Sequence, residues 1–374
     1  MMRLVSALLL TIGLAAAALR APRPVPAAFA AVPVPVAEAL PSAADRGWRI
    51  ELQQEQPSAH ASTLALASDG SVLVAWFAGS REGARDVQIE MARIFAGQPP
   101  TRWTALTREQ LQTGVRRSIR KLGNPMLCRA ADGRLHLFVV SVSVGGWSGS
   151  AINVLDSSDD ARTWSAPRRV ILSPLLNFSS LVRAPAMPLA DGGLGLPAYH
   201  ECVTKWALWT RLDADGRVVG STRMPQTGPA LQPAVAALSS EAAVAVLRRA
   251  RGSTPRVLAC RTDDGGASWV TAPDTGIPNP DSGVALVRLR DGTLLMACNP
   301  LEGGRHTLQF FHSQDGGASW SSGAVIERGP ADAEFSYPAL LHDGHGEVVL
   351  SYTHNRAMIV VRCVSAAWAM GIPQ

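Results

Sequence analysis

The sequence predicts an all-β fold built from repeated units, and three observations lead to that prediction. The nonapeptides RTDDGGASW (261–269) and HSQDGGASW (312–320) end in the same six residues. Beyond residue 46 the chain consists of short apolar runs separated by turn signals. Between those runs we find no long amphipathic helix pattern. Self-similarity at a fixed spacing is typical of repeat architectures, so we expect consecutive copies of one β-unit.

The apolar runs pair around Asp-Gly turn signals in four places. Glycine adopts positive φ without steric penalty, and Asp-Gly between two apolar runs is a strong hairpin signal. The four predicted hairpins are residues 62–79, 126–142, 284–298 and 339–352.

A weaker third copy of the repeated phrase, SSDDARTW, occupies residues 157–164, with Ala161 where the other copies have Gly. Trp164 and Trp269 lie 105 residues apart, whereas Trp269 and Trp320 lie 51 apart. Because the first interval is close to twice the second, we expect one unmarked unit between the first two copies.

The spacing also fixes the expected number of units. LWTRLDADGRVVG (208–220) is the candidate for the unmarked copy, and QPPTRWTA (98–105) should end the first unit. About 330 residues at roughly 50–60 residues per unit give six units. Repeated four-stranded units of that length predict a six-bladed β-propeller over residues 46–370.

Each position shared by the copies of the repeated phrase has a local structural use. The Asp can accept hydrogen bonds from backbone N–H groups of its own turn, the Gly permits the turn geometry, and the Trp can pack between adjacent sheets. We therefore expect Asp159, Asp264 and Asp315 to be structural and not catalytic.

The N-terminus predicts export. Met1-Met2-Arg3 is followed by an apolar run at 5–19, and small-residue sites suited to signal peptidase stand at 15–17 and 28–30. We expect a signal peptide at 1–30, with an uncleaved N-terminal anchor as the alternative, and a periplasmic or secreted protein. Residues 31–45 are rich in Pro and Ala and predict a linker.

Charge and cysteine content exclude several partners. Without the three arginines of residues 1–30, 32 basic residues stand against 30 acidic ones, and no Lys/Arg run occurs. We therefore expect neither nucleic acid nor a membrane surface as a partner, apart from the alternative anchor. The five cysteines fit no metal spacing, so we expect small buried side chains, no metal motif and no organic cofactor.

The repeated phrase resembles the Asp-box of the sialidase (neuraminidase) superfamily, whose members are six-bladed propellers, and the resemblance extends over about residues 55–365. WFAGSREGARDVQIEMAR (76–93) is similar to the segment with the family's acid/base Asp. The resemblance assigns that role to Asp86, with Arg81 five residues before it. AEFSYPALL (333–341) resembles the segment with the nucleophilic Tyr, here Tyr337.

The resemblance also covers the residues that bind the substrate carboxylate. Arg248 and Arg305 fall where the second and third arginines of the family's triad would be. The first arginine's position holds His60, and the position of the Glu that polarises the Tyr holds Gln232. Arg183 is a candidate for the third positive charge, although its order in the chain differs from the family's.

The resemblance implies an exo-glycosidase that removes a terminal acidic or modified sugar from a glycan. A neutral phenol avoids repulsion from an anionic sugar, but it needs activation because its free pKa is near 10. Gln232 cannot take the proton, so Glu82, Glu201 and His60 are the candidate bases, and Tyr199 is expected to line the cleft. A non-catalytic glycan-binding propeller and a uronate polysaccharide lyase are the alternatives. We expect a monomer with a glycan ligand.

Overall fold

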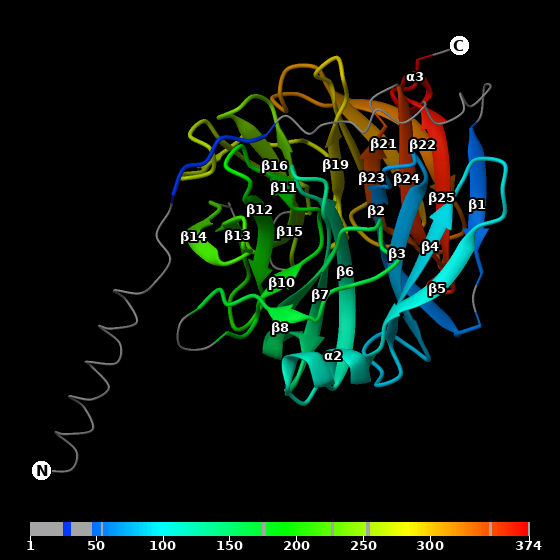
Figure 1. The fold of residues 1–374 in the computed structure, drawn as a ribbon. Coiled ribbons are helices and arrows are strands. Elements are labelled where there is room, and N and C mark those ends of the chain that lie inside the picture. The colour runs from blue at the N-terminus through cyan, green and yellow to red at the C-terminus, as the bar shows by residue number, and fades with distance from the viewer. Residues whose placement is uncertain are drawn as a thin grey trace, which may run out of the picture.

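The computed structural model describes residues 25–30, 47–53, 55–173, 177–225, 228–251, 255–343 and 346–372. Six antiparallel sheets are arranged around a common axis (Figure 1). Five sheets have four strands, and the remaining one has five because two short strands share its innermost position. The predicted all-β, six-bladed propeller is therefore confirmed.

Each of the first three blades begins with its innermost strand and runs outward. Blade 1 contains β2 (Ser58–Leu66), β3 (Val72–Gly79), β4 (Gln88–Ile94) and β5 (Thr101–Leu106). Blade 2 contains β6 (Lys121–Arg129), β7 (Leu135–Val142), β8 (Ser150–Ser157) and β9 (Arg168–Arg169). Blade 3 contains β10 (Leu181–Val182), β11 (Met187–Pro188), β12 (Leu194–His200), β13 (Trp206–Leu212) and β14 (Val218–Arg223).

The next two blades repeat this order. Blade 4 contains β15 (Ala230–Ala237), β16 (Ala243–Arg249), β17 (Leu258–Thr262) and β18 (Val270–Thr271). Blade 5 contains β19 (Ala285–Arg288), β20 (Leu294–Cys298), β21 (Thr307–Ser313) and β22 (Ser321–Arg328).

Blade 6 closes the ring by joining the two ends of the propeller. Its strands are β23 (Phe335–His342), β24 (Glu347–His354), β25 (Met358–Ser365) and β1 (Trp48–Leu52). The N-terminal strand β1 pairs with β25 from Trp48↔Cys363 to Leu52↔Ile359. This pairing gives the outer edge of the last blade a hydrogen-bonded partner strand.

Among the described residues the helices are short and lie outside the ring. They are the 3₁₀ turn Trp147–Gly149 and the helices α2 (Arg108–Val115) and α3 (Ala366–Ala369), with α2 and α3 at opposite ends of the molecule (Figure 1). Thr107 caps α2 in a capping box with Gln110. No helix within the described ranges is long and apolar enough to cross a bilayer.

The repeated phrases form the turns between the third and fourth strands of blades 2, 4 and 5. In each, the Asp accepts from the backbone N–H of the residue four positions later, at 2.9 Å, and from that residue's hydroxyl; the pairs are Asp159–Thr163, Asp264–Ser268 and Asp315–Ser319. The hydroxyl and backbone bonds from Thr163 lower the pKa of Asp159 to about 2. These aspartates stabilise their own turns, as predicted.

The unmarked copy and the end of the first unit also lie where the spacing placed them. Residues 208–220 contain the β13–β14 hairpin, which is the equivalent connection of blade 3, and Asp213 accepts from the backbone N–H of Arg217 at 2.8 Å. Residues 98–105 run into β5, the outer strand of blade 1.

Only part of the predicted leader falls within the described residues. The linker at 31–45 and residues 1–24 lie outside them. Phe29 is buried against Trp209, with the ring centroids 5.7 Å apart, and Ala30 donates to the carbonyl of Pro188 at 3.0 Å. The sequence placed these residues outside the core, and the structure differs because the large Phe29 ring fills a gap beside Trp209.

The cysteines form no disulfide. All five are free thiols, and four of them are buried, whereas Cys202 is half-buried. Burial raises the pKa of Cys260 to about 12, so this thiol stays protonated. The prediction of small buried side chains is confirmed for those four.

Candidate functional site

A ring of irregular backbone surrounds the propeller axis at one end. One residue near the start of each innermost strand has a left-handed φ between 42° and 62°; these residues are Ala61, Asn124, Ser179, Gln232, Asp281 and Tyr337. In β2, β6, β15 and β23 the residue lies at a register shift. Non-glycine residues avoid this region, and such strain collects at functional sites. The ring therefore marks this end as the candidate site.

The sequence contains a signal for three members of this ring. Asn124, Gln232 and Tyr337 each precede a proline. Proline has no N–H to donate to a ladder and is tolerated within sheets at bulges. The repeated X-Pro at the start of inner strands is the pattern that sequence reasoning missed.

A network of hydrogen bonds connects the side chains of blades 2, 3, 4 and 6 at this end. The hydroxyl of Tyr199 accepts from Asn124 Nδ2 at 3.1 Å and from Gln232 Nε2 at 3.4 Å. Arg248 Nη1 donates to Gln232 Oε1 at 3.1 Å and to the Tyr337 hydroxyl at 3.0 Å. Four of the predicted site residues, Tyr199, Gln232, Arg248 and Tyr337, are therefore brought together.

The same network continues through blades 5 and 6. Arg248 Nε donates to Asp281 Oδ1 at 2.8 Å, and the Asp281 carbonyl accepts from Arg305 Nη2 at 3.0 Å. Arg305 Nη1 donates to Glu334 Oε1 at 3.0 Å. Hydrogen bonds from Arg356 and Ser336 and the charges of both arginines lower the pKa of Glu334 to about 2 despite its burial. Glu334 is therefore a carboxylate at neutral pH.

Arg356 links blade 6 back to blade 1, and sequence reasoning did not identify it. Its Nε donates to Glu334 Oε2 at 2.8 Å, and its Nη1 donates to Glu82 Oε2 at 2.6 Å. Glu82 was predicted from the sequence as a candidate base, and it lies at this junction. Only the assembled ring brings the β24–β25 turn to the β3–β4 loop, which explains why Arg356 was missed.

Tyr337 is a buried titratable group surrounded by arginines. It is buried, and three guanidinium carbons lie near its ring centroid: Arg183 at 5.3 Å, Arg305 at 5.5 Å and Arg248 at 5.9 Å. Burial raises the pKa of the phenol, but the charges of Arg248 and Arg305 outweigh burial, so the pKa lies below its usual 10. Cations therefore favour the phenolate here.

Arg183 supports Tyr337 from behind. Its Nη2 donates to the backbone carbonyl of Tyr337 at 2.8 Å, and burial lowers the pKa of its guanidinium to about 10. It also lines a cavity of about 690 Å³ between the inner strands, which continues past Pro338 along the axis. Arg183 thus binds the strained backbone of Tyr337 and places a positive charge beside its ring.

His60 packs edge-on against Tyr337, with the ring centroids 4.5 Å apart. The imidazole is 1% exposed, both ring nitrogens lack a hydrogen-bond partner among the described residues, and Nε2 is 3.9 Å from Glu82 Oε2. Burial and the charge of Arg356 hold the pKa of His60 well below its usual range. The ring is therefore uncharged at neutral pH.

Asp86 and Arg81 occupy the exposed part of the β3–β4 loop at the same end of the molecule. Asp86 accepts from the backbone N–H of Ser80 at 2.9 Å and from its hydroxyl at 3.0 Å. These bonds stabilise its own loop. Asp86 therefore lies at the rim, outside the hydrogen-bonded network.

Glu201 follows β12 and is partly buried at the same end. Its backbone N–H donates to the Ser179 hydroxyl at 2.9 Å. Burial raises the pKa of its carboxyl, which also interacts with the charges of Arg248 and Asp281. Glu201 is thus a second carboxyl near the network, and its pKa is raised.

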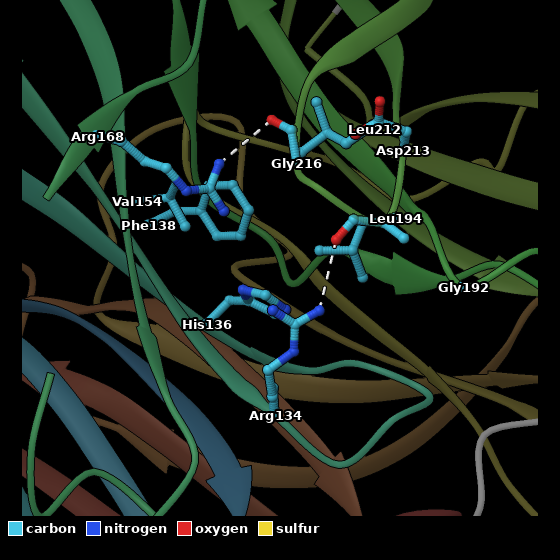
Figure 2. Close-up of a pocket in the computed structure, with 11 residues that line it drawn as sticks. Arg134, His136, Phe138, Val154, Arg168, Gly192, Leu194, Leu212, Asp213 and Gly216 are labelled. Atoms are coloured by element: carbon cyan, nitrogen blue, oxygen red, sulfur yellow. Dashed lines mark hydrogen bonds between the residues drawn. The ribbon is translucent and has the colours of Figure 1, made fainter. Parts of the chain in front are cut away.

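A separate small pocket lies between blades 2 and 3 (Figure 2). Arg134 and Arg168 reach from blade 2 toward the backbone of the β13–β14 turn, and His136 bonds Asp156 at 2.6 Å. The volume of this pocket is about 10 Å³, which is room for roughly one water molecule. This pocket is too small for a sugar. No cluster able to hold a metal ion occurs among the residues that the structure describes.

The architecture matches solved propellers at low sequence identity. A Hadza microbial sialidase superposes with a TM-score of 0.69 and 17% identity, covering 83% of this chain and 66% of that one. The NanB sialidase from Streptococcus pneumoniae gives 0.67 and 10%, covering 85% and 70%. A protein of unknown function from Dyadobacter fermentans gives 0.68 and 13%, covering 87% and 99%.

This chain thus spans about two thirds of the length of the Hadza sialidase, and at these identities the likeness shows the fold alone. No curated protein sequence matches the chain. The model of the BNR repeat-like domain matches residues 70–350, which include the three repeated phrases and all but the ends of the propeller. The chain therefore belongs to the BNR repeat-like domain family, and its six-bladed propeller is similar in fold to these sialidases.

Proposed function

We propose that this protein is a sialidase-like exo-glycosidase that hydrolyses a terminal acidic sugar from a glycan. The observation that supports the proposal most is the buried phenol of Tyr337, which accepts a hydrogen bond from Arg248 and has a lowered pKa. The fold is similar to that of sialidases, which agrees with the proposal, but the proposal rests on the arrangement of Tyr337 and Arg248. Action on glycans outside the cytoplasm would agree with the export signal predicted at residues 1–30.

In the proposed reaction Tyr337 is the nucleophile. Its oxygen forms a bond to the anomeric carbon while the bond from that carbon to the leaving oxygen breaks. Asp86, on the loop at the rim, gives a proton to the leaving oxygen and then takes one from the water that cleaves the tyrosyl intermediate. The anomeric configuration is retained because two displacements occur.

The activation of the nucleophile differs from that in proteins with a Glu beside the Tyr. Arg248 Nη1 donates both to Gln232 Oε1 and to the Tyr337 hydroxyl, and the Gln232 amide cannot take the phenolic proton as a base. In our proposal the arginine charges increase the fraction of phenolate, and the proton leaves to solvent before the sugar binds. The negative charge of Glu82 opposes this ionisation, but the arginine charges outweigh it and the pKa of Tyr337 is lowered overall.

The same cations suit an anionic sugar. Arg248 and Arg305 both lie within 6 Å of the Tyr337 ring centroid. A guanidinium binds a carboxylate with two parallel charge-assisted hydrogen bonds. We propose that these two arginines hold the sugar's carboxylate while Tyr337 attacks.

The test is hydrolysis of a fluorogenic sialoside by the wild type and by Tyr337→Phe, with Tyr352→Phe as the matched control. Tyr352 is also a buried tyrosine of blade 6, but its hydroxyl bonds Glu327, away from the network. We expect turnover by the wild type and the control and none by Tyr337→Phe. Equal turnover by all three proteins would exclude Tyr337 as the nucleophile.

A uronate lyase is the second candidate, because a phenolate stabilised by arginines also suits removal of the C5 proton of a uronate. It predicts an unsaturated product with a new ultraviolet absorbance from uronate polysaccharides. The third, a glycan-binding propeller without turnover, is favoured by Gln232, since no carboxylate bonds the Tyr337 hydroxyl among the described residues. Saturable binding of an acidic glycan without any cleavage would select it.

A further inference from the structure

We propose that Arg356 is the third anion-binding arginine of this site, supplied by the β24–β25 turn instead of by β2, where the chain has His60. The inference rests on the proposed function, because it concerns how the cleft binds a sugar carboxylate. It assigns a specificity role to a residue that sequence reasoning missed.

The first support is the position of the Arg356 guanidinium beside a second one. Glu334 accepts from Arg305 Nη1 with one carboxylate oxygen, at 3.0 Å, and from Arg356 Nε with the other, at 2.8 Å. One carboxylate therefore holds both arginines close together. Arg305 lies in turn 5.5 Å from the Tyr337 ring centroid, so Glu334 and Arg305 connect Arg356 to the surroundings of Tyr337.

The second support is the strained turn that presents Arg356. Asn355 and Arg356 have φ values of 50° and 54°. The turn is fixed by the bond from Asn355 N–H to the Glu334 carbonyl, at 2.7 Å, and by the bond from Glu334 N–H to Asn355 Oδ1, at 2.8 Å. Strain of this kind persists only where the surroundings over-determine it.

The turn is also tied to blade 1 next to the position that lacks an arginine. The backbone N–H of Ala59 donates to the Arg356 carbonyl at 2.9 Å, and Ala59 immediately precedes His60. The two positions therefore lie side by side across the junction between the last blade and the first. A cation from the turn can occupy the space that an arginine on β2 would otherwise reach.

The third support is the state of His60. Its two nitrogens have no hydrogen-bond partner among the described residues, and the nearby charge of Arg356 is one cause of its lowered pKa. A protonated imidazole would repel Arg356. The neutral His60 therefore tolerates the nearby charge of Arg356. We infer that Arg356 supplies the positive charge that an arginine at position 60 would otherwise supply.

Arg356 has room to meet a ligand. Its side chain is 42% exposed, while Glu334 and Glu82 engage its Nε and Nη1. A guanidinium has five N–H donors in a planar fork, so donors remain after these two bonds. The two glutamates thus orient a partly exposed cation that keeps donors for a ligand.

The experiment compares binding of a sugar acid with binding of its neutral methyl ester. The probes are the methyl glycosides of sialic acid and of glucuronic acid, each with its ester, titrated by calorimetry. The proteins are the wild type, Arg356→Gln, Arg356→Lys and the control Arg217→Gln, an arginine in the blade 3 hairpin whose side chain is 76% exposed. Thermal unfolding verifies that each variant is folded.

We expect Arg356→Gln to weaken acid binding by about 10- to 100-fold and leave ester binding unchanged, since a charge-assisted bond is lost. Arg356→Lys should recover part of the loss, and Arg217→Gln should match the wild type. If the wild type prefers an acid and Arg356→Gln keeps that preference, the role of Arg356 is overturned and the proposed function stands. If the wild type does not prefer either acid, both are overturned.

A double variant tests the exchange between the two positions. In the Arg356→Gln background, His60→Arg should restore part of the preference for the acid, because it returns a cation from β2. His60→Arg alone should be less stable than the wild type, because two guanidinium groups would then compete for one space. A folded double variant that prefers the acid no more than Arg356→Gln does would overturn the exchange.

Discussion

The repeated turns and the axial network both use hydrogen-bonded charged side chains, but they are built in opposite ways. In the repeated turns an Asp bonds the residue four positions later, and the same bonds recur in blades 2, 4 and 5. In the axial network Arg248 bonds Tyr337, 89 positions away, and each blade contributes a different side chain. The residues that repeat between blades therefore stabilise the turns, whereas the strained positions near the axis differ in residue type from blade to blade and form the candidate site.

The backbone tells the two regions apart as clearly as the side chains do. The turns place glycines such as Gly265 and Gly316 at positive φ, where glycine is unstrained. The axial ring places residues such as Gln232 and Tyr337 there, at an energetic cost of about 1–3 kcal/mol each. Glycine at the ring positions would avoid this steric cost, as it does in the turns.

The largest expected effect separates the regions by activity. Tyr337→Phe should lower turnover of a cleaved glycan by at least about 10³-fold with little change in the melting temperature. Asp264→Ala should leave turnover unchanged and modestly lower the melting temperature, since it removes only bonds within its own turn. Steady-state kinetics and thermal unfolding of both variants test the comparison. Loss of turnover in a folded Asp264→Ala protein would break it.

The second effect concerns acid stability at the site. The pKa of Glu334 is about 2 when folded, against 4.5 for the unperturbed group, so its bonds stabilise the fold fully above pH 4.5. That contribution, on the order of 2–3 kcal/mol, should be lost as the pH falls from 4.5 toward 2.

Glu334→Gln provides the measurement, because its stability deficit in denaturant unfolding should be largest near neutral pH and shrink toward pH 2. The carboxylate of Glu51, which is paired at the surface, supplies the control, and Glu51→Gln should show a much smaller deficit. A pH-independent deficit in Glu334→Gln would mean that packing and not charge is lost.

The third effect is a difference among the three tyrosines of the chain. The arginines lower the pKa of Tyr337 below 10, whereas burial raises the pKa of Tyr199 and of Tyr352 above it. Spectrophotometric titration of the folded protein should therefore show one phenol ionising below the usual value, and Tyr337→Phe should remove that step. Arg248→Met should move it to higher pH. Retention of the early step in Tyr337→Phe would assign it to another tyrosine.

The smallest effect sharpens the comparison within the repeated turns. Asp264 accepts hydroxyl and backbone bonds, so Asp264→Ala should destabilise the fold by about 1–2 kcal/mol. Asp213, in the degenerate copy, bonds the backbone of Arg217, so Asp213→Ala should cost about 0.5–1 kcal/mol. Denaturant unfolding measures both, and an equal loss would show that the degenerate turn is as strong as the marked one.

Several site residues could be predicted because the family resemblance gives them a place in the sequence. Arg248, Arg305, Tyr337 and Gln232 were predicted and meet in one network. Arg356 and Glu334 were not predicted, because their partners come from other blades and no local pattern identifies them. Asp86 was predicted as an acid, and it accepts hydrogen bonds from Ser80 within its own loop.

The sequence by itself determined the features that depend on neighbours along the chain. These are the hairpins around Asp-Gly, the repeated Asp turns and, through their spacing, the number of blades. Only the tertiary structure decided the closure of the ring by β1, the charge environment of Tyr337 and the place of Arg356 beside His60. The physical reason is that a turn satisfies its hydrogen bonds locally, whereas a charge network at the axis exists only after all six blades have closed around it.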